Sequence, residues 1–514
     1  MEVTGNFDMS EEKEHKSAMD SPDLTATPHG EFPSSRHLKW AVTFLLVYFG
    51  LRLLFFAIKI SPFVPPDEVT HFGLSRIFSN VFFLPENSTE TYQYGLVTNI
   101  PWLYYWIMGK LLAVNFFGLP DLLFLRLLNI PFAFGTVYFV WRTLRLLTDD
   151  RLIQLLLLVA MTNTLMFSFL SASVSYDNLL NLLAAMSIYY LLAFFKERSG
   201  NLLALCFLCQ LAGSLTKITF LPLILVMNGL LLVHEFRHLR SFPRALPAWF
   251  EAAGWRGPVL VLGILLALAL NIQLYGGNYL HFHSLQPEMY EVLPREIAMK
   301  NRLQARTMIF DMFKEGRVSK EKALEMTAQI RNSGDRADTV ALIENYDDVL
   351  KGKGEEKLFP LEYTGLWLLN MAGTIYGIKA HQYMPDSGPL LYMFLALMLL
   401  SGIAFLVKWR PREAGAWLHA SLAAIACFYA VFLLYFVNYQ AYLDTKVFGM
   451  TVTGRYLLPI VGAIYVVSSY YMLRLFGRGY ARLVIAVGVG LLFIASDFPF
   501  FLLHATPEWF LVPP

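Results

Sequence analysis

The sequence contains little charge and almost no cysteine. Only 16% of its 514 residues are Asp, Glu, Lys or Arg, whereas 56% are hydrophobic and the mean hydropathy is +0.48. A soluble domain carries about a quarter charged residues, so this composition indicates an integral membrane protein. The formal net charge of +2 provides no broad basic face and argues against a nucleic-acid-binding protein. The three cysteines lie in apolar runs, which argues against a disulfide framework.

Long apolar runs dominate the rest of the chain. A helix needs about 17 to 25 apolar residues to cross a bilayer, and about eleven segments fit this length. They are residues 39–59, 124–146, 152–171, 177–195, 201–216, 219–234, 257–275, 388–407, 415–436, 455–473 and 482–503. We therefore expect an all-α polytopic membrane protein. Residues 1–38 are polar and lack apolar periodicity, so they are predicted to be a disordered cytoplasmic tail.

The positions of basic residues predict the orientation of these helices. If the N-terminus is cytoplasmic, Lys and Arg gather in every inside connection, for example in residues 142–151, 408–412 and 474–482. This is the pattern that the positive-inside rule requires, and it places the C-terminus outside the cytoplasm. A further span at residues 100–118 would invert the later connections. We therefore interpret that segment as an interfacial or re-entrant helix on the outer face.

This topology divides the chain into four parts. They are the tail 1–38, an N-terminal transmembrane module 39–275, an extracytoplasmic and mostly helical segment 276–387, and a C-terminal transmembrane module 388–514. The first outer loop, residues 60–123, belongs to the N-terminal module and is expected to carry catalytic residues.

That loop contains the stretch "PPDEVTHF", residues 65–72, which concentrates charge at the membrane edge. The prolines suit the lead-in to a helix, which places Asp67 and Glu68 in a first turn where the helix dipole favours anions. Asp67 and His71 are four residues apart and share a helix face, which suits proton transfer. An ordinary acidic helix start with an interfacial histidine explains the same pattern. Asp67 and Glu68 are also candidates for a divalent cation, whereas no zinc motif is present.

Three basic residues interrupt the pattern of basic inside connections, because they lie at predicted outer helix ends: Arg126, Lys217 and Arg455. A side chain that extends to the membrane surface explains each one alone. Because all three lie on the side of the carboxylates, together they predict a site for an anionic ligand such as a phosphate. Asp177 lies on the same side beside Tyr176, and a helix cap explains it when it is taken alone.

The order of these landmarks resembles the GT-C superfamily of multi-pass glycosyltransferases, which includes protein O-mannosyltransferases and the aminoarabinose transferase of lipid A. An uncharacterised bacterial branch of predicted membrane proteins is the most similar. The resemblance is carried by "PPDEVTHF", "NIPWLYYWIMGKLL", "LRLLNIPFAFGTVYFVWRTLRLL", "SYDNLLNLLAAMSIYYLL", "SLTKITFLPLILV" and "GRYLLPI". It covers residues 40–235 and 388–480. The chain departs from the family at Asn99-Ile100-Pro101, where relatives have His-Pro-Pro.

The resemblance implies a role for each candidate residue. Asp67 is expected to be the catalytic base, with Glu68 and His71 beside it, and Glu68 to position the acceptor or bind a metal ion. The donor phosphate is expected to be held by Arg455, Lys217 and Arg126. Substrate contacts are expected from Tyr456, Tyr104, Tyr105, Tyr176 and Asp177.

The activity implied by the resemblance is inverting transfer of a sugar from a polyprenyl phosphate to an extracytoplasmic glycan, lipid or protein. No cofactor is required, and Mg or Mn is an optional ion. The expected location is the bacterial inner membrane, with the active site facing the periplasm or exterior. A transporter or flippase is the alternative, and it predicts inverted repeats and charge near the bilayer midplane. A third interpretation is a scaffold that presents residues 276–387 to a partner.

Overall fold

The computed structural model describes residues 35–116, 118–236, 249–330, 333–353, 358–380, 383–384, 388–413, 415–448, 452–477 and 479–511. Its regular structure is helical, apart from one antiparallel pairing of two short strands, β1 (Ile378–Lys379) and β2 (Tyr383–Met384). The predicted all-α class is therefore confirmed. Most of the predicted tail, residues 1–34, lies outside the described residues.

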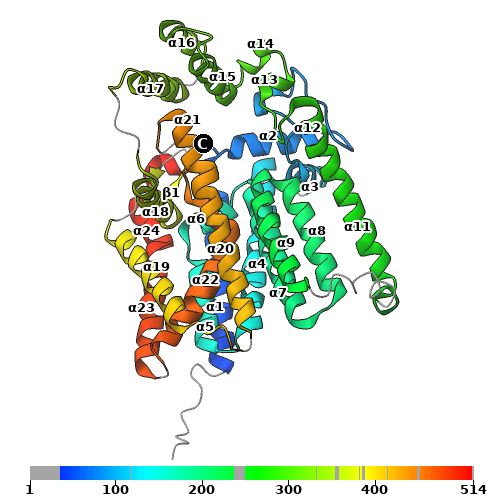
Figure 1. The fold of residues 1–514 in the computed structure, drawn as a ribbon, viewed down its shortest axis with the longest axis vertical. Coiled ribbons are helices and arrows are strands. Elements are labelled where there is room, and N and C mark those ends of the chain that lie inside the picture. Colours follow the sequence, from blue (N-terminus) through cyan, green and yellow to red (C-terminus); the bar gives the residue numbers. More distant parts are fainter. Residues whose placement is uncertain are drawn as a thin grey trace, which may run out of the picture.

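The apolar helices run roughly side by side and form one bundle (Figure 1). They are α1 (Ser35–Lys59), α4 (Asp121–Leu147), α5 (Arg151–Thr162), α6 (Leu165–Ser171), α7 (Tyr176–Glu197), α8 (Gly200–Thr216), α9 (Leu221–Glu235), α11 (Arg256–Asn271), α19 (Pro389–Lys408), α20 (Ala416–Phe432), α22 (Leu458–Leu475), α23 (Tyr480–Ser496) and α24 (Phe498–His504). Each predicted apolar segment coincides with one or two of these helices.

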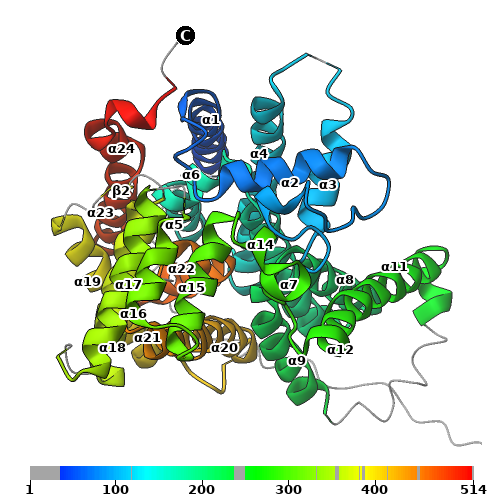
Figure 2. The same cartoon turned by 90° about the horizontal axis from the view of Figure 1, so that it is seen from above.

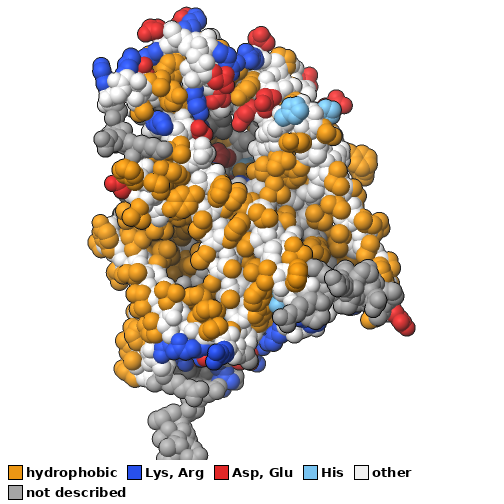
Figure 3. Space-filling view, viewed as in Figure 1, with side chains coloured by type: hydrophobic (Ala, Val, Ile, Leu, Met, Phe, Trp, Pro, Cys, Tyr) orange, Lys and Arg blue, Asp and Glu red, His pale blue; other side chains and the backbone are white. Residues whose placement is uncertain are grey.

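Within the described residues, nine helices are long and apolar enough to cross a membrane, and the bent pair α5 and α6 makes up to ten. Helix α8 is shorter, at 17 residues. The face shown in Figure 3 agrees with a membrane protein, because hydrophobic side chains cover its middle and charged ones gather at its two ends. The chain is thus polytopic, while the number of eleven spans stays a prediction.

A second, smaller layer of helices covers one end of the bundle (Figures 1 and 2). It contains α2 (Glu68–Ser79), α3 (Leu103–Leu112), α12 (Gly277–Phe282), α13 (Met289–Val292), α14 (Arg295–Ala298), α15 (Arg302–Lys314), α16 (Lys320–Thr327), α17 (Ser333–Leu350), α18 (Pro360–Tyr376) and α21 (Gln440–Thr445). Helix α3 has 10 residues and is too short to cross a bilayer. This agrees with the prediction that residues 100–118 do not cross the membrane. Segment 276–387 is mostly helical, as expected, and α15, α16 and α17 share a small core around Ile309 and Ile343.

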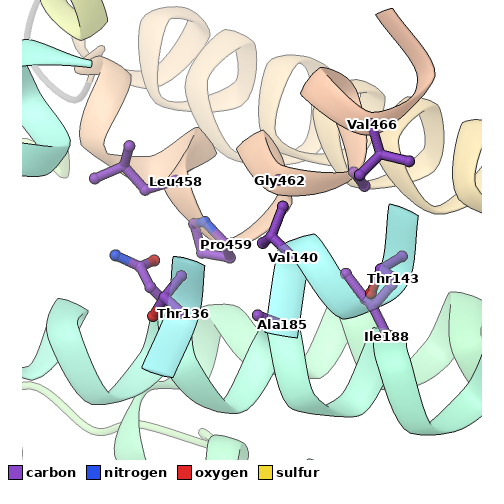
Figure 4. Close-up of a pocket in the computed structure, with 11 residues that line it drawn as sticks. Thr136, Val140, Thr143, Ala185, Ile188, Leu458, Pro459, Gly462 and Val466 are labelled. Carbon is purple, nitrogen blue, oxygen red and sulfur yellow. The ribbon is translucent and has the colours of Figure 1, made fainter. Parts of the chain in front are cut away.

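Helices α4, α7 and α22 pack closely at the centre of the bundle. Figure 4 shows the narrow gap between them, where Gly462 of α22 faces Val140 of α4. A Cβ atom on Gly462 would lie 2.4 Å from Cγ2 of Val140, so a larger residue would separate the helices. This packing fixes the start of α22, which carries part of the candidate site.

A buried ion pair joins two broken helices inside the bundle. Helices α5 and α6 meet at an angle of 61°, and Arg52 of α1 donates to the carbonyl oxygen of Thr162 at that break. Arg52 also pairs with Asp497, between α23 and α24. Because the backbone loses helical hydrogen bonds at each break, this pair replaces polar contacts that the lipid cannot provide.

Candidate active site

The candidate residues meet at the end of the bundle that the smaller helical layer covers. Asp67 and His71 lie at the start of α2, Tyr176 and Asp177 begin α7, and Lys217 separates α8 from the 3-10 turn η2 (Ile218–Phe220). Arg455 and Tyr456 belong to the 3-10 turn η5 (Gly454–Leu457), which leads into α22. Segments far apart in the sequence therefore supply the residues at this end of the bundle.

The carboxylate of Asp67 faces Arg455. Asp67 is the N-cap of α2 and adopts a left-handed conformation, with φ 57° and ψ 13°. Its Oδ2 accepts a hydrogen bond from Nη2 of Arg455 at 3.0 Å, and their side chains are 31% and 11% exposed. Gly454 allows η5 to approach α18, because a Cβ there would lie 2.5 Å from Cγ1 of Ile375. The pair is therefore held by two turns and stays partly open to solvent.

Lys217 forms the second ion pair of the cluster. Its Nζ lies 2.7 Å from Oδ1 of Asp177, and it also lies over the rings of Tyr176 and Tyr456, at 4.4 and 4.7 Å from their centroids. Burial by itself lowers the pKa of Lys217, but Asp177 and the two tyrosines outweigh it and raise the pKa above its usual value. Lys217 is therefore a buried cation at neutral pH. Arg455 also lies over the ring of Tyr456, at 5.3 Å from its centroid, so the two cations share one ring.

His71 lies beneath these residues and is almost completely buried. Its Nδ1 lies 2.9 Å from the hydroxyl of Tyr105, and its ring contacts that of Tyr176, with centroids 4.4 Å apart. Its Nε2 has no hydrogen-bond partner among the described residues. Burial lowers the pKa of His71 to about 4, against the opposing charges of Asp67 and Asp177. The imidazole is thus neutral at pH 7, and its hydrogen bond is with Tyr105 rather than with Asp67.

Glu68 and Arg126 belong to a separate, structural pair. Nε and Nη2 of Arg126 donate to the two carboxylate oxygens of Glu68, at 2.8 and 2.5 Å. Nη1 of Arg126 donates to the carbonyl oxygens of Ala57 and Ile60, and Glu68 accepts from the backbone N–H of Val174. Burial raises the pKa of Glu68, and Arg126 and Val174 oppose that rise. This geometry does not agree with Arg126 as a phosphate ligand, since its donors serve protein acceptors and it is 2% exposed.

Tyr104 also has a structural role. Its hydroxyl donates to Oδ1 of Asn129 at 3.1 Å, and Asn178 donates to the same oxygen. Asn178 further donates to the carbonyl oxygens of Leu170 and Ser173, just before α7. Neither asparagine was predicted from the sequence to hold this network together. The available signal was their polarity inside apolar helices, where an amide side chain needs a partner.

Asp67 and Glu68 are the two residues that were expected to bind a divalent cation. Among the described residues, no group of three or more His, Cys, Asp or Glu side chains could hold a metal. Asp67 and Glu68 face different cations, Arg455 and Arg126. A divalent cation at these two carboxylates therefore stays a prediction.

No family model and no curated protein matches the sequence. Three solved chains are similar in structure. ArnT from Cupriavidus metallidurans in the apo state has 15% identity and a TM-score of 0.35, over 85% of this chain and 78% of that chain. The same protein bound to undecaprenyl phosphate has 13% identity and a TM-score of 0.34, over 86% and 78%.

The archaeal oligosaccharyltransferase AglB from Archaeoglobus fulgidus, in complex with an inhibitory peptide and a dolichol-phosphate, has 13% identity. Its TM-score is 0.45, over 91% of this chain and 56% of that chain. Because all three TM-scores are below 0.5, no argument about the chemistry of this chain depends on them.

Proposed function

We propose that this protein is a membrane glycosyltransferase that moves a sugar from a polyprenyl-phosphate donor to an acceptor at the outer membrane surface. One observation carries the proposal: Lys217 and Arg455 both contact the ring of Tyr456, and Arg455 contacts the partly exposed Asp67. This brings two cations and one accessible carboxylate together at one end of an apolar bundle.

The cations suit the leaving group of the reaction. Transfer from a polyprenyl phosphate leaves negative charge on a phosphate, and fixed cationic side chains stabilise such charge as it develops. Arg455 offers a planar fork of donors, whereas Lys217 offers a compact charge.

Asp67 suits the role of base. An acceptor hydroxyl becomes a good nucleophile when a carboxylate within hydrogen-bond reach takes its proton. The donor phosphate competes with Asp67 for Arg455, so donor binding weakens the contact between Arg455 and this carboxylate. A single displacement of this kind inverts the configuration at the anomeric carbon. The orientation predicted from the basic residues places this end of the bundle on the extracytoplasmic side of a bacterial inner membrane.

The transporter alternative has less support from the positions of the charged residues. That alternative predicts accessible charge inside the bundle. Arg52 and Asp497 form such a pair within the described part of the chain, but they are 2% and 0% exposed and contact each other at helix breaks. We therefore assign this pair to the stability of the bundle.

A transfer assay with full-length protein in liposomes tests the proposal. The donor is a polyprenyl-phosphate sugar, and the variants are Arg455→Gln and Lys217→Gln. Each should weaken donor binding and slow transfer by about tenfold or more, because each removes a charged hydrogen-bond donor from the phosphate site. Lys110→Gln is the matched control, because Lys110 is bound to the carbonyl oxygen of Phe78 outside the cluster. Equal donor affinity in all four proteins would contradict the phosphate site.

A further inference from the structure

The end of segment 276–387 lies against the turn that carries Arg455. This end consists of α18 and β1, and the proposed transfer reaction uses none of its side chains. The two backbones approach closely, because a Cβ on Gly454 would lie 2.7 Å from the carbonyl oxygen of Met371 and 2.7 Å from the backbone nitrogen of Ile375. The turn η5 therefore packs directly on the backbone of α18.

Thr374 of α18 holds the first residue of this turn. Its Oγ1 accepts a hydrogen bond from the backbone N–H of Gly454 at 2.7 Å, and the side chain is buried. The same hydroxyl donates to the carbonyl oxygen of Asn370, one helical turn earlier, at 2.7 Å. Because that bond uses the hydrogen of the hydroxyl, the lone pairs of its oxygen are left to accept from Gly454.

Lys379 of β1 holds the chain just before this turn. Its Nζ donates to the carbonyl oxygen of Val452 at 2.8 Å, and Val452 is buried. Lys379 itself is placed by the pairing of β1 with β2, in which it lies opposite Tyr383. One continuous stretch of chain, residues 374–379, thus contacts the backbone on both sides of Thr453, directly before Arg455.

The position of the Arg455 guanidinium depends on this backbone. After the turn, the chain enters α22, whose start is fixed by the packing of Gly462 on Val140. Before the turn, the contacts from α18 and β1 hold it. A buried N–H group that loses its acceptor is unfavourable, so the turn would move to find another one. Because a good hydrogen bond tolerates a range of only about 0.5 Å in distance, such a movement weakens the bonds that Arg455 can make.

We propose that Thr374 and Lys379 are positioning residues, which hold η5 so that the guanidinium of Arg455 meets the donor phosphate. Both act through the backbone of residues 452–454 and not by contact with the donor. The inference rests on the proposed function, in which Arg455 binds that phosphate. It gives the end of segment 276–387 a part in donor binding, in addition to the contacts that Arg455 makes with Asp67 and Tyr456.

Calorimetric titration of the full-length protein with farnesyl phosphate, a short polyprenyl phosphate, tests this proposal. Thr374→Val removes the hydroxyl and keeps the shape of the side chain, so it should bind about tenfold more weakly. Thr374→Ser keeps the hydroxyl and should bind like wild type. Lys379→Met should bind about threefold more weakly. Thr364→Val is the matched control, because Thr364 also lies on α18 and donates to the carbonyl oxygen of Pro360, but its second contact is Tyr435.

The same variants in an Arg455→Gln background separate positioning from a general loss of stability. If Thr374 acts through Arg455, Thr374→Val should cause no further loss of affinity there. Lys379→Met gives the same comparison if Thr374→Val does not fold. Equal losses in both backgrounds, equal losses in Thr374→Val and Thr374→Ser, or wild-type affinity in Thr374→Val and Lys379→Met would overturn the proposal and leave the phosphate site intact. Wild-type affinity in Arg455→Gln itself would contradict the phosphate site, and this inference with it.

Discussion

Asp67 and Glu68 are neighbours in the chain but have opposite surroundings. The Glu68 side chain is 0% exposed, and both of its oxygens contact the guanidinium of Arg126. The Asp67 side chain is 31% exposed, and one of its oxygens contacts Arg455. Glu68 joins α2 to Arg126 of α4 and to the backbone N–H of Val174, whereas Asp67 faces the cluster that contains Lys217 and Tyr456.

The comparison teaches that a carboxylate–cation pair at a membrane edge has no fixed role. A buried pair that meets further acceptors and donors on every side holds helices in place, and losing one partner leaves a charge without compensation. In the pair of Asp67 and Arg455 the carboxylate is partly exposed, so a ligand can reach the pair and replace one partner. The proposed chemistry therefore depends on Asp67, and the architecture around it depends on Glu68.

The largest expected effect on stability comes from Glu68→Gln. This variant leaves the Arg126 guanidinium buried opposite a neutral amide, which should reduce the free energy of unfolding by about 3–5 kcal/mol. Thermal unfolding in detergent measures the effect, with Asp67→Asn as the matched control. If both variants unfold at the wild-type temperature, the structural role of Glu68 is refuted.

A smaller effect should appear in the pH dependence of stability. The pKa of His71 is lowered by burial to about 4, below the ordinary value of 6.5. Because the unfolded chain then binds the proton more readily, the contribution of His71 is fully present above pH 6.5 and decreases as the pH falls toward 4. Between pH 7 and pH 5 the loss should be about 2 kcal/mol.

His71→Asn tests this prediction, because its side chain cannot gain a proton in this range. Unfolding of wild type and variant should be compared at pH 7 and at pH 5. The difference in stability between the two proteins should shift by about 2 kcal/mol in favour of the variant at the lower pH. A constant difference would mean that His71 does not titrate as described.

The smallest expected effect concerns the backbone at Asp67. Its φ of 57° lies in the left-handed region, which Asn tolerates better than Ala. Asp67→Ala should therefore be less stable than Asp67→Asn by about 1 kcal/mol, although both variants remove the same charge. Equal unfolding free energies of these two variants would show that the left-handed N-cap does not matter for stability.

Much of the fold and part of the site could be predicted from the sequence. The apolar runs correspond to helices, and the distribution of basic residues places Lys217 and Arg455 on the side of Asp67, where the structure brings them together. Hydrophobic length and charge distribution are local properties of a chain, so they can be read from it directly.

The parts that could not be predicted depend on tertiary geometry. Treating Asp67 as helical placed it on the same face as His71, but Asp67 lies before α2 in a left-handed conformation. Arg126 was expected to hold a phosphate because nothing in the sequence shows that Glu68 and the end of α1 surround its guanidinium. Arg52 pairs with Asp497, which lies more than 400 residues away in the sequence, and only the fold joins them.

One measurement tests the central claim most directly: single-turnover sugar transfer by Asp67→Asn in liposomes, expressed per folded molecule. Asn keeps the shape of the side chain and the left-handed backbone but cannot accept the proton of an acceptor hydroxyl. The account predicts that transfer slows by about a hundredfold or more, while the unfolding temperature stays close to that of wild type. Transfer at the wild-type rate would contradict Asp67 as the base.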